Sequence, residues 1–245
     1  MQSPRLGHKA PTPAKFAMSP VRLTVLYEDN HVLAVFKPAG LPTMGTPGGR
    51  PTLWTIAKQY IKERYHKPGN VYLGVVSRLD SPVTGVVLFA RTSKAAARLT
   101  EQFRARTVEK TYWAIVEGIV EPPVDECIDW VLHDERSKRM RVVDPLVADA
   151  RQARLSYRRK DVLDDATLLE LELETGRKHQ IHVQLAHRHH PIVGDAKYGS
   201  HRAFAHGIAL HARRVAFDHP VRHERIELQA AVPPSWRALG VVEEG

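Results

Sequence analysis

Short runs of apolar residues separated by turn-forming residues recur along this chain, a pattern typical of β-strands. Residues 24–27 and 31–36 are two such runs on either side of a polar turn, and they predict a hairpin. Residues 71–76 and 86–90 predict two more strands, joined by a polar segment with Ser-Pro and Thr-Gly turn signals. The chain is therefore expected to build much of its structure from strands.

Alternation of apolar and polar residues predicts a second hairpin later in the chain. Residues 155–162 and 168–173 are predicted strands around a pair of aspartates. In the second strand three leucines alternate with glutamates, so one face is expected to be buried and the other to be acidic. Residues 110–116 also have the composition of a strand.

Apolar residues at helical spacing predict helices over residues 52–65 and 93–106, and Ser93 is expected to cap the second one. Residues 178–187 fit both periods, because their apolar residues alternate as in a strand and also satisfy helical spacing. Strands outnumber helices and follow hairpin order. The predicted fold class is α+β, with a mainly antiparallel mixed sheet and flanking helices.

One domain is favoured, because 245 residues can bury a sizeable core. Residues 1–20 are rich in proline and basic residues and are predicted to be a disordered tail, with residues 236–245 as a C-terminal tail. No stretch is apolar enough for a secretory signal core or a membrane span. The expected location is the cytoplasm.

Charge adds a first indication of a partner. The 245 residues include 36 Lys and Arg against 27 Asp and Glu, a formal charge of +9, which favours a polyanion such as RNA. Cys127 is the single cysteine, so no internal disulfide can form, and a buried, unreactive thiol is expected. A monomer is the default expectation.

Asp80 lies in the polar segment between the strands predicted over residues 71–76 and 86–90. A loop held between strands presents side chains that core packing would bury, which makes such positions suitable for catalytic groups. Aspartate is also common in turns because its side chain bonds to nearby backbone. Local sequence alone leaves both interpretations of Asp80 open.

Several strings in fixed order resemble the RluA-type pseudouridine synthases, over about residues 21–235. The strings are Arg78-Leu79-Asp80 with Thr84-Gly85, Lys110-Thr111-Tyr112-Trp113-Ala114, Thr175-Gly176-Arg177-Lys178-His179-Gln180-Ile181, His190-Pro191-Ile192, and Leu210-His211-Ala212, preceded by Lys37-Pro38-Ala39-Gly40-Leu41. The resemblance implies the pseudouridine synthase catalytic fold, a helix over residues 178–187, and isomerisation of specific uridines in ribosomal or transfer RNA.

Pseudouridine formation breaks the bond from uracil N1 to ribose C1′, turns the base over, and joins C5 to C1′. The resemblance implies no cofactor and no metal, and it makes Asp80 the catalytic carboxylate. Attack at C1′, attack at uracil C6 and abstraction of the ribose 2′ proton all remain open.

Other site residues follow from the same resemblance. Arg177 is the candidate partner that holds Asp80 ionised and aimed, and Tyr112 is expected to lie against the target uracil. Arg78, Lys110 and Lys178 are the candidate RNA-binding residues.

The chain departs from the family pattern at Ser77, where histidine is usual, and at Ser81-Pro82-Val83, which alters the loop expected to meet RNA. The family's frequent S4-type RNA-binding domain is not expected in the twenty residues before the catalytic domain. The histidines between His179 and His190 favour polar packing or RNA contacts over a zinc site, because no cysteine accompanies them.

Two other functions compete with an RNA pseudouridine synthase. The first is a non-catalytic RNA-binding or RNA-folding protein that keeps the fold, motivated by the charge and the altered loop. The second is a carboxylate-based glycosidase. Such an enzyme needs a second carboxylate as the partner of Asp80, and no carboxylate in the sequence pairs convincingly with it.

Overall fold

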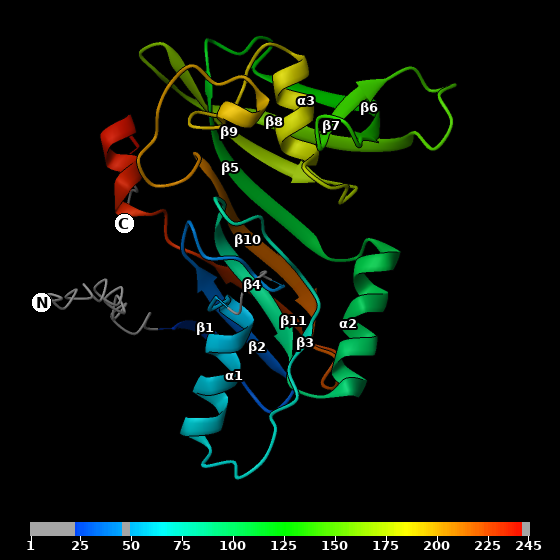
Figure 1. The fold of residues 1–245 in the computed structure, drawn as a ribbon, viewed down its shortest axis with the longest axis vertical. Coiled ribbons are helices and arrows are strands. Elements are labelled where there is room, and N and C mark those ends of the chain that lie inside the picture. Colours follow the sequence, from blue (N-terminus) through cyan, green and yellow to red (C-terminus); the bar gives the residue numbers. More distant parts are fainter. Residues whose placement is uncertain (1–22, 46–49, 242–245) are drawn as a thin grey trace, which may run out of the picture.

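A computed structural model of the protein describes residues 23–45 and 50–241, and in them eleven strands form one mixed sheet (Figure 1). The strand order is β1-β2-β4-β10-β5-β9-β8-β6-β7, with β3 beside β4 and β11 beside β10. Every pairing is antiparallel except that of β4 with β10. The predicted α+β class is therefore confirmed.

The strands are β1 (Thr24–Glu28), β2 (Val32–Lys37), β3 (Gly74–Val75), β4 (Thr84–Ala90), β5 (Glu109–Glu117), β6 (Val124–Asp134), β7 (Arg139–Val143), β8 (Arg151–Leu163), β9 (Ala166–Leu173), β10 (Leu210–Asp218) and β11 (Arg225–Gln229). The helices are α1 (Leu53–Arg64), α2 (Ser93–Ala105) and α3 (Gln180–His187), with short 3-10 helices η2 (Ala196–Tyr198) and η3 (Pro234–Leu239).

Both predicted hairpins are present, as β1 with β2 and as β8 with β9. The ambiguous segment 178–187 contains a helix, α3. Of the strand predicted over residues 71–76, only the two residues of β3 are in strand conformation. Strand β3 pairs with the end of β4, whereas β2 and β10 form the other pairings of β4. Strands β6, β7, β10 and β11 were not predicted from periodicity.

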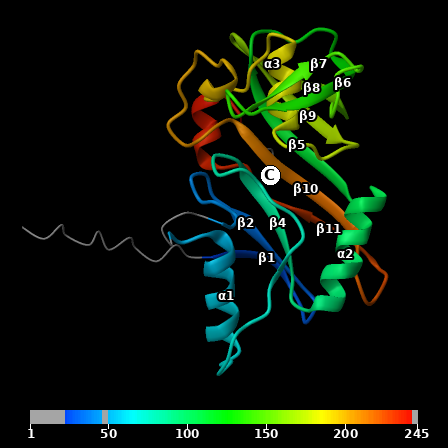
Figure 2. The same ribbon diagram turned by 45° about the vertical axis from the view of Figure 1, so that its right-hand side comes forward.

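Strand β4 is buried along its whole length because helices cover both faces of the β2–β4 pair. Leu33 and Val35 of β2 pack toward α1, whereas Val32 and Ala34 pack toward α2, on the opposite face (Figure 2). Full burial of a side chain such as Leu33 contributes about 1.5–3 kcal/mol. This two-sided packing explains the unbroken apolar run of β4 and gives the loop before it a rigid anchor.

Threonines cap the first two helices. Thr52 and Thr55 form a capping box at the start of α1. The cap of α2 is Thr92, whose side chain accepts from the Ala95 N–H, so the expectation that Ser93 caps this helix was wrong by one residue. None of the helices in the described residues is long and apolar enough to cross a membrane.

The C-terminal segment belongs to the core. Trp236 in η3 and Val241 are buried in the same apolar cluster as β5 and β9. The tail predicted from residue 236 is therefore corrected, because a buried indole ties this segment to the domain as far as residue 241. The predicted N-terminal tail, residues 1–20, lies outside the described residues.

Cys127 lies on β6 and is fully buried, as expected. Burial raises the pKa of its thiol to about 11, so the thiolate is scarce at neutral pH.

Candidate active site

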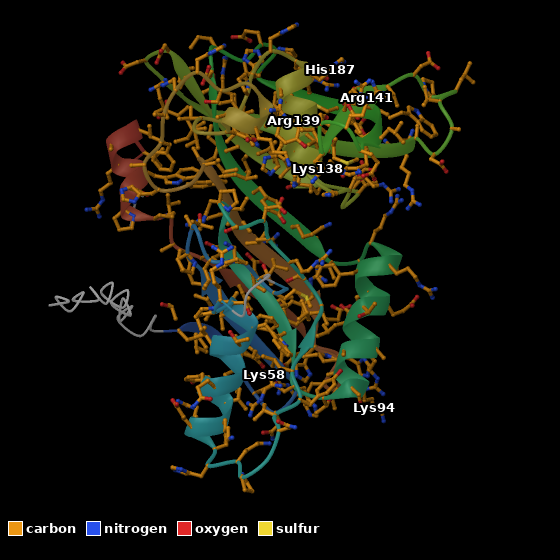
Figure 3. The ribbon with its side chains drawn as sticks, viewed as in Figure 1. Lys58, Lys94, Lys138, Arg139, Arg141 and His187 are labelled. Atoms are coloured by element: carbon orange, nitrogen blue, oxygen red, sulfur yellow. The ribbon has the colours of Figure 1, made fainter. Side chains whose placement is uncertain are left out.

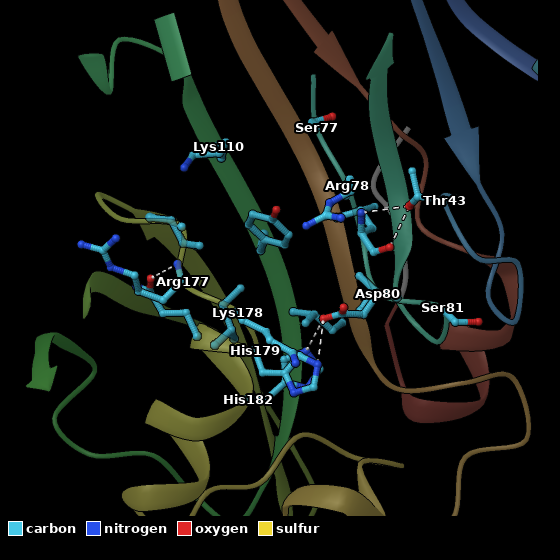
Figure 4. A pocket seen from close by; sticks show the side chains of 18 of the residues that line it. Thr43, Ser77, Arg78, Asp80, Ser81, Lys110, Arg177, Lys178, His179 and His182 are labelled. Atoms are coloured by element: carbon cyan, nitrogen blue, oxygen red, sulfur yellow. Dashed lines mark hydrogen bonds and ion pairs between the residues drawn. The ribbon is translucent and has the colours of Figure 1, made fainter. Parts of the chain in front are cut away.

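A cavity of about 770 Å³ opens where the loop before β4 faces β5 and the start of α3 (Figure 4). All six residues predicted for the site line this cavity: Asp80, Tyr112, Arg177, Arg78, Lys110 and Lys178. Residues separated by about one hundred positions in the sequence therefore meet at one place.

Asp80 is presented by a loop whose backbone is fixed on both sides. The Thr43 hydroxyl donates to the Leu79 carbonyl (2.8 Å) and accepts from the Leu79 N–H (3.1 Å). On the other side, the Gly40 N–H donates to the Ser81 carbonyl (2.8 Å), and the Val83 N–H donates to the Asp80 carbonyl (3.1 Å). The carboxylate itself remains 47% exposed. Asp80 is thus a half-exposed acid on a rigid loop.

Lys37, at the end of β2, is fully buried beneath this loop. Its ammonium donates to the carbonyls of Pro38 (2.9 Å), Leu41 (2.8 Å) and Ser81 (2.9 Å). Burial lowers its pKa to about 7, and the negative charge of Asp80 opposes that shift. The sequence contained Lys37 in a family string, but nothing local distinguished it from a surface lysine.

Gly85 explains why Thr84-Gly85 follows Asp80 so closely. It has a φ of +123°, and a Cβ there would lie 2.3 Å from the Ala212 carbonyl oxygen on the parallel strand β10. Only glycine allows that approach. Beside it, the Thr84 hydroxyl and His211 Nδ1 are 2.8 Å apart, so the side chain of His211, on β10, links that strand to β4.

Tyr112 lies on β5 between Leu171 of β9 and Ala212 of β10. Burial, and then the negative charge of Asp80, raise the pKa of its hydroxyl to about 12. The side chain is therefore a neutral phenol next to the carboxylate.

The rings of two histidines, in the segment that begins α3, face the Asp80 carboxylate. His179 Nε2 and His182 Nε2 each lie 3.7 Å from Asp80 Oδ2 (Figure 4). Behind them, His182 Nδ1 is 2.7 Å from Asp195 Oδ2, and His179 Nδ1 is 2.7 Å from the Tyr198 hydroxyl. The expectation for these histidines was polar packing or RNA contacts, without a role in catalysis. Helical spacing at i and i+3 was the signal that would have placed both on one face.

Arg177 lines the cavity but does not pair with Asp80. Its guanidinium points away from the carboxylate, and its Nε donates to the Gln152 carbonyl (3.0 Å) (Figure 4). Burial and the nearby charges of Arg106 and Arg151 lower its pKa. The predicted Arg177–Asp80 pairing is therefore corrected.

Gln180 is the physical reason for the position of Arg177. Its Oε1 accepts from the Thr175 hydroxyl (2.7 Å) and from the Arg177 N–H (3.0 Å), while its Nε2 donates to the Arg154 carbonyl (3.0 Å). These bonds fix the turn before α3 so that the helix presents His182 to the cavity. Gln180 stands in one of the family strings, but no role was predicted for it.

The three predicted RNA-binding cations differ in environment. Arg78 is exposed and makes no hydrogen bond or ion pair with other described residues. Burial, followed by the charge of Arg106, lowers the pKa of Lys110. Lys178 is exposed, with its ammonium 3.4 Å from His133 Nε2. Arg78 is the cation most available to a phosphate.

Comparison with known proteins shows the family of the chain. The family model for RNA pseudouridylate synthase matches residues 31–187. The chain is 36% identical over 242 residues to ribosomal large subunit pseudouridine synthase D of Xanthomonas campestris, covering 89% of this chain and 69% of that protein. It is 30% identical over 241 residues to tRNA pseudouridine synthase C of Vibrio parahaemolyticus, covering 91% of this chain and 95% of that protein.

Among solved structures, human RNA pseudouridylate synthase domain containing 4 has the same fold. The TM-score is 0.75 at 24% identity, with 91% of this chain and 95% of that chain covered.

Fold, cavity and comparisons together define an RNA-modifying isomerase, and the chain belongs to the RNA pseudouridylate synthase family, of the RluA type. It is an RNA pseudouridine synthase, and so an enzyme rather than the non-catalytic RNA-binding protein kept as the alternative.

Proposed function

We propose that Asp80 is the catalytic carboxylate, acting at the sugar–base junction of a uridine extruded into the 770 Å³ cavity. The observation that carries this proposal is a half-exposed carboxylate on a fixed loop, facing the cavity that Tyr112 also lines. An ionised acid placed against the ribose or the base splits the exchange of bonds into easier steps. Because the carboxylate is half-exposed and lines the cavity, a group bound in the cavity can contact it.

Extrusion of the base has a cost that the cavity offsets. Unpairing and unstacking a nucleotide costs a few kcal/mol, and stacking on an aromatic side chain returns about 1–3 kcal/mol. We assign that stacking to Tyr112, which stays neutral because its pKa is raised to about 12. The cavity volume also falls within the range of about 300–1,000 Å³ usual for ligand pockets.

The RNA strand on either side of the uridine meets the cations at the cavity edge. In the proposal Arg78, Lys110, Lys178 and Arg177 face phosphates there, Arg78 foremost because it has no partner among the described residues. Phosphate contacts of this kind position the nucleic acid without reading its sequence.

The proposed substrate is a uridine of ribosomal or transfer RNA. Support comes from relatives named as synthases for large-subunit ribosomal RNA and for transfer RNA. The proposal further places the enzyme in the cytoplasm as a monomer, as charge and the single cysteine led us to expect.

The experiment is a pseudouridine map of total RNA from cells lacking the gene and complemented with one of three forms. Native protein is expected to restore the missing mark, Asp80→Asn to restore none, and Asp164→Asn to restore it fully. Asp164 is a matched control because it is an exposed aspartate in the β8–β9 turn, at a φ of +50° that asparagine tolerates. Restoration of the mark by Asp80→Asn, in protein shown to be folded, would remove Asp80 from the chemistry.

A further inference from the structure

Resting on the proposed role of Asp80, we infer that His182, held by Asp195, is the positioning residue that aims Asp80 at the substrate. A histidine thus takes the place where the sequence led us to expect the guanidinium of Arg177. The consequence is an active site whose supporting charge depends on pH.

Asp195 is a buried carboxylate that contacts the His182 ring. It is 5% exposed, and His182 Nδ1, 2.7 Å from its Oδ2, is the side-chain partner that the described residues provide. A buried carboxylate is strongly unfavourable unless a cation or hydrogen-bond donors accompany it. Asp195 therefore holds an N–H of the His182 imidazole at Nδ1.

The contact with Asp195 sets the orientation of the His182 ring. A carboxylate only accepts hydrogen bonds, so the proton on His182 Nδ1 faces Asp195, and Nε2 faces Asp80 Oδ2 at 3.7 Å. In the imidazolium, Nε2 carries a proton and attracts the Asp80 carboxylate. In the neutral ring with its proton on Nδ1, Nε2 turns a lone pair toward that carboxylate and repels it. One proton on His182 thus decides whether Asp80 is attracted or repelled.

His179 cannot supply the same charge. The Tyr198 hydroxyl accepts from the Met140 N–H (3.0 Å), which leaves its own proton for His179 Nδ1 at 2.7 Å. Burial lowers the pKa of His179 to about 4, so the ring is neutral near pH 7. It offers Asp80 an N–H dipole, and the charge has to come from His182.

Charged and titratable groups face His182 from every neighbouring element. The direct neighbours are Asp80 from the loop before β4, His179 from the start of α3, and Asp195 and Tyr198 from the segment around η2. Three lysines act indirectly. The charges of Lys178 and Lys197 act on His179, and that of Lys37 interacts with Asp80. Lys37 also loses its charge near neutral pH, because its pKa is about 7. The test must therefore separate Lys37 from His182.

Tritium release from RNA carrying 5-tritiated uridine, extracted from cells lacking the gene, measures activity because the reaction displaces the hydrogen at C5. For the native enzyme kcat is expected to fall as pH rises and His182 loses its proton. His182→Arg, whose charge is permanent, should retain activity and lose that decline. His182→Gln should lower kcat on the order of 100-fold with a much smaller change in KM. His187→Gln, an exposed histidine at the other end of α3, should match the native enzyme.

Equal pH profiles for the native enzyme and His182→Arg would overturn the inference and would assign the decline to Lys37 or another group. Loss of activity by His182→Arg at every pH, in protein that stays folded, would also overturn the inference, because a permanent positive charge at this position would then fail to support Asp80.

The second readout needs no activity. The pH titration of the His182 ring protons, followed by NMR and assigned by their absence in His182→Gln, should move to lower pH in Asp195→Asn and in Asp80→Asn, because each removes a negative charge that holds the proton. Unchanged midpoints in both variants would refute the coupling. If Asp80→Asn remained active in the complementation experiment, the proposed function would fail on its own, whatever the titration showed.

Discussion

The loop that carries Asp80 rests on a buried amine. Three backbone carbonyls, those of Pro38, Leu41 and Ser81, surround the Lys37 ammonium, and the side chain is fully buried. Such a group costs free energy to bury as a cation and costs less as a neutral amine. The residue that holds the Asp80 loop is thus sensitive to pH in its own right.

Lys37→Met is predicted to remove a specific pH dependence of stability. The pKa of Lys37 is about 7 in the folded protein and 10.5 in its ordinary state, so between these values the unfolded chain binds more protons than the native one. The free energy of unfolding of the native protein should therefore rise with pH over this interval, relative to Lys37→Met, by up to about 1.4 kcal/mol per pH unit.

Urea unfolding at pH 6 to 10 measures the difference. Lys62→Met, which removes an exposed lysine of α1, should show no such slope against the native protein. A difference between native protein and Lys37→Met that stays constant with pH would contradict the burial of this amine.

Single residues also show which parts of the site could be predicted from the sequence and which could not. The order of family strings was enough to gather Asp80, Tyr112 and the four cations, and all of them line one cavity. The pairing of Arg177 with Asp80 was wrong, because the bonds of Gln180 fix the preceding turn and so decide which α3 residue faces the acid. Gln180 Nε2 also donates to the Arg154 carbonyl, 26 positions away, and no local pattern reveals that proximity.

Helices and strands differ in how clearly the sequence shows their apolar periodicity, and this decides which of them could be predicted. The hairpins β1–β2 and β8–β9 keep clear apolar runs or alternation, and both were predicted. Strand β10 contains an Arg-Arg pair and a register shift between Ala212 and Arg214, which breaks the period of two. Strand β6 carries exposed acidic residues at its start, and β7 is the edge of the sheet, so neither has a long apolar run.

At the junction of β4 and β10, Gly85→Ala is predicted to be strongly destabilising. The added Cβ would meet the backbone of Ala212 at 2.3 Å, at a φ of +123° that side chains rarely adopt. Steric overlap and backbone strain together should lower the free energy of unfolding by at least about 3 kcal/mol.

Gly40→Ala is the matched control. Gly40 also has a positive φ, +79°, but a Cβ there has no neighbour within 4 Å, so only strain of about 1 kcal/mol is expected. Thermal unfolding of both variants measures the difference. Equal losses for the two would contradict the close approach of β4 to β10.

Over the whole molecule, a formal charge of +9 provides attraction to RNA without specifying where it binds. Many arginines are occupied in ion pairs with acidic residues, such as Arg214 with Glu227 and Arg188 with Asp129. The cations that remain at the cavity edge are the ones available to release counterions from a bound strand.

Arg78→Gln is therefore predicted to flatten the salt dependence of RNA binding. Loss of one phosphate contact should reduce the slope of log K against log salt by about 0.7–0.9. Lys94→Gln is the control, because it removes one positive charge from an exposed position at the start of α2, away from the cavity (Figure 3). Filter binding over a range of salt concentrations measures both slopes. Equal slopes for the two variants would exclude a direct contact by Arg78.

The most direct measurement for the whole account is a crystal structure of Asp80→Asn bound to an RNA fragment that contains the uridine identified by the complementation map. The predicted result is a uridine turned out of its strand, with its ring against Tyr112 and its glycosidic bond about 3–3.5 Å from the side chain of residue 80. A bound strand whose target uridine remains stacked, or enters the protein away from residue 80, would contradict the account.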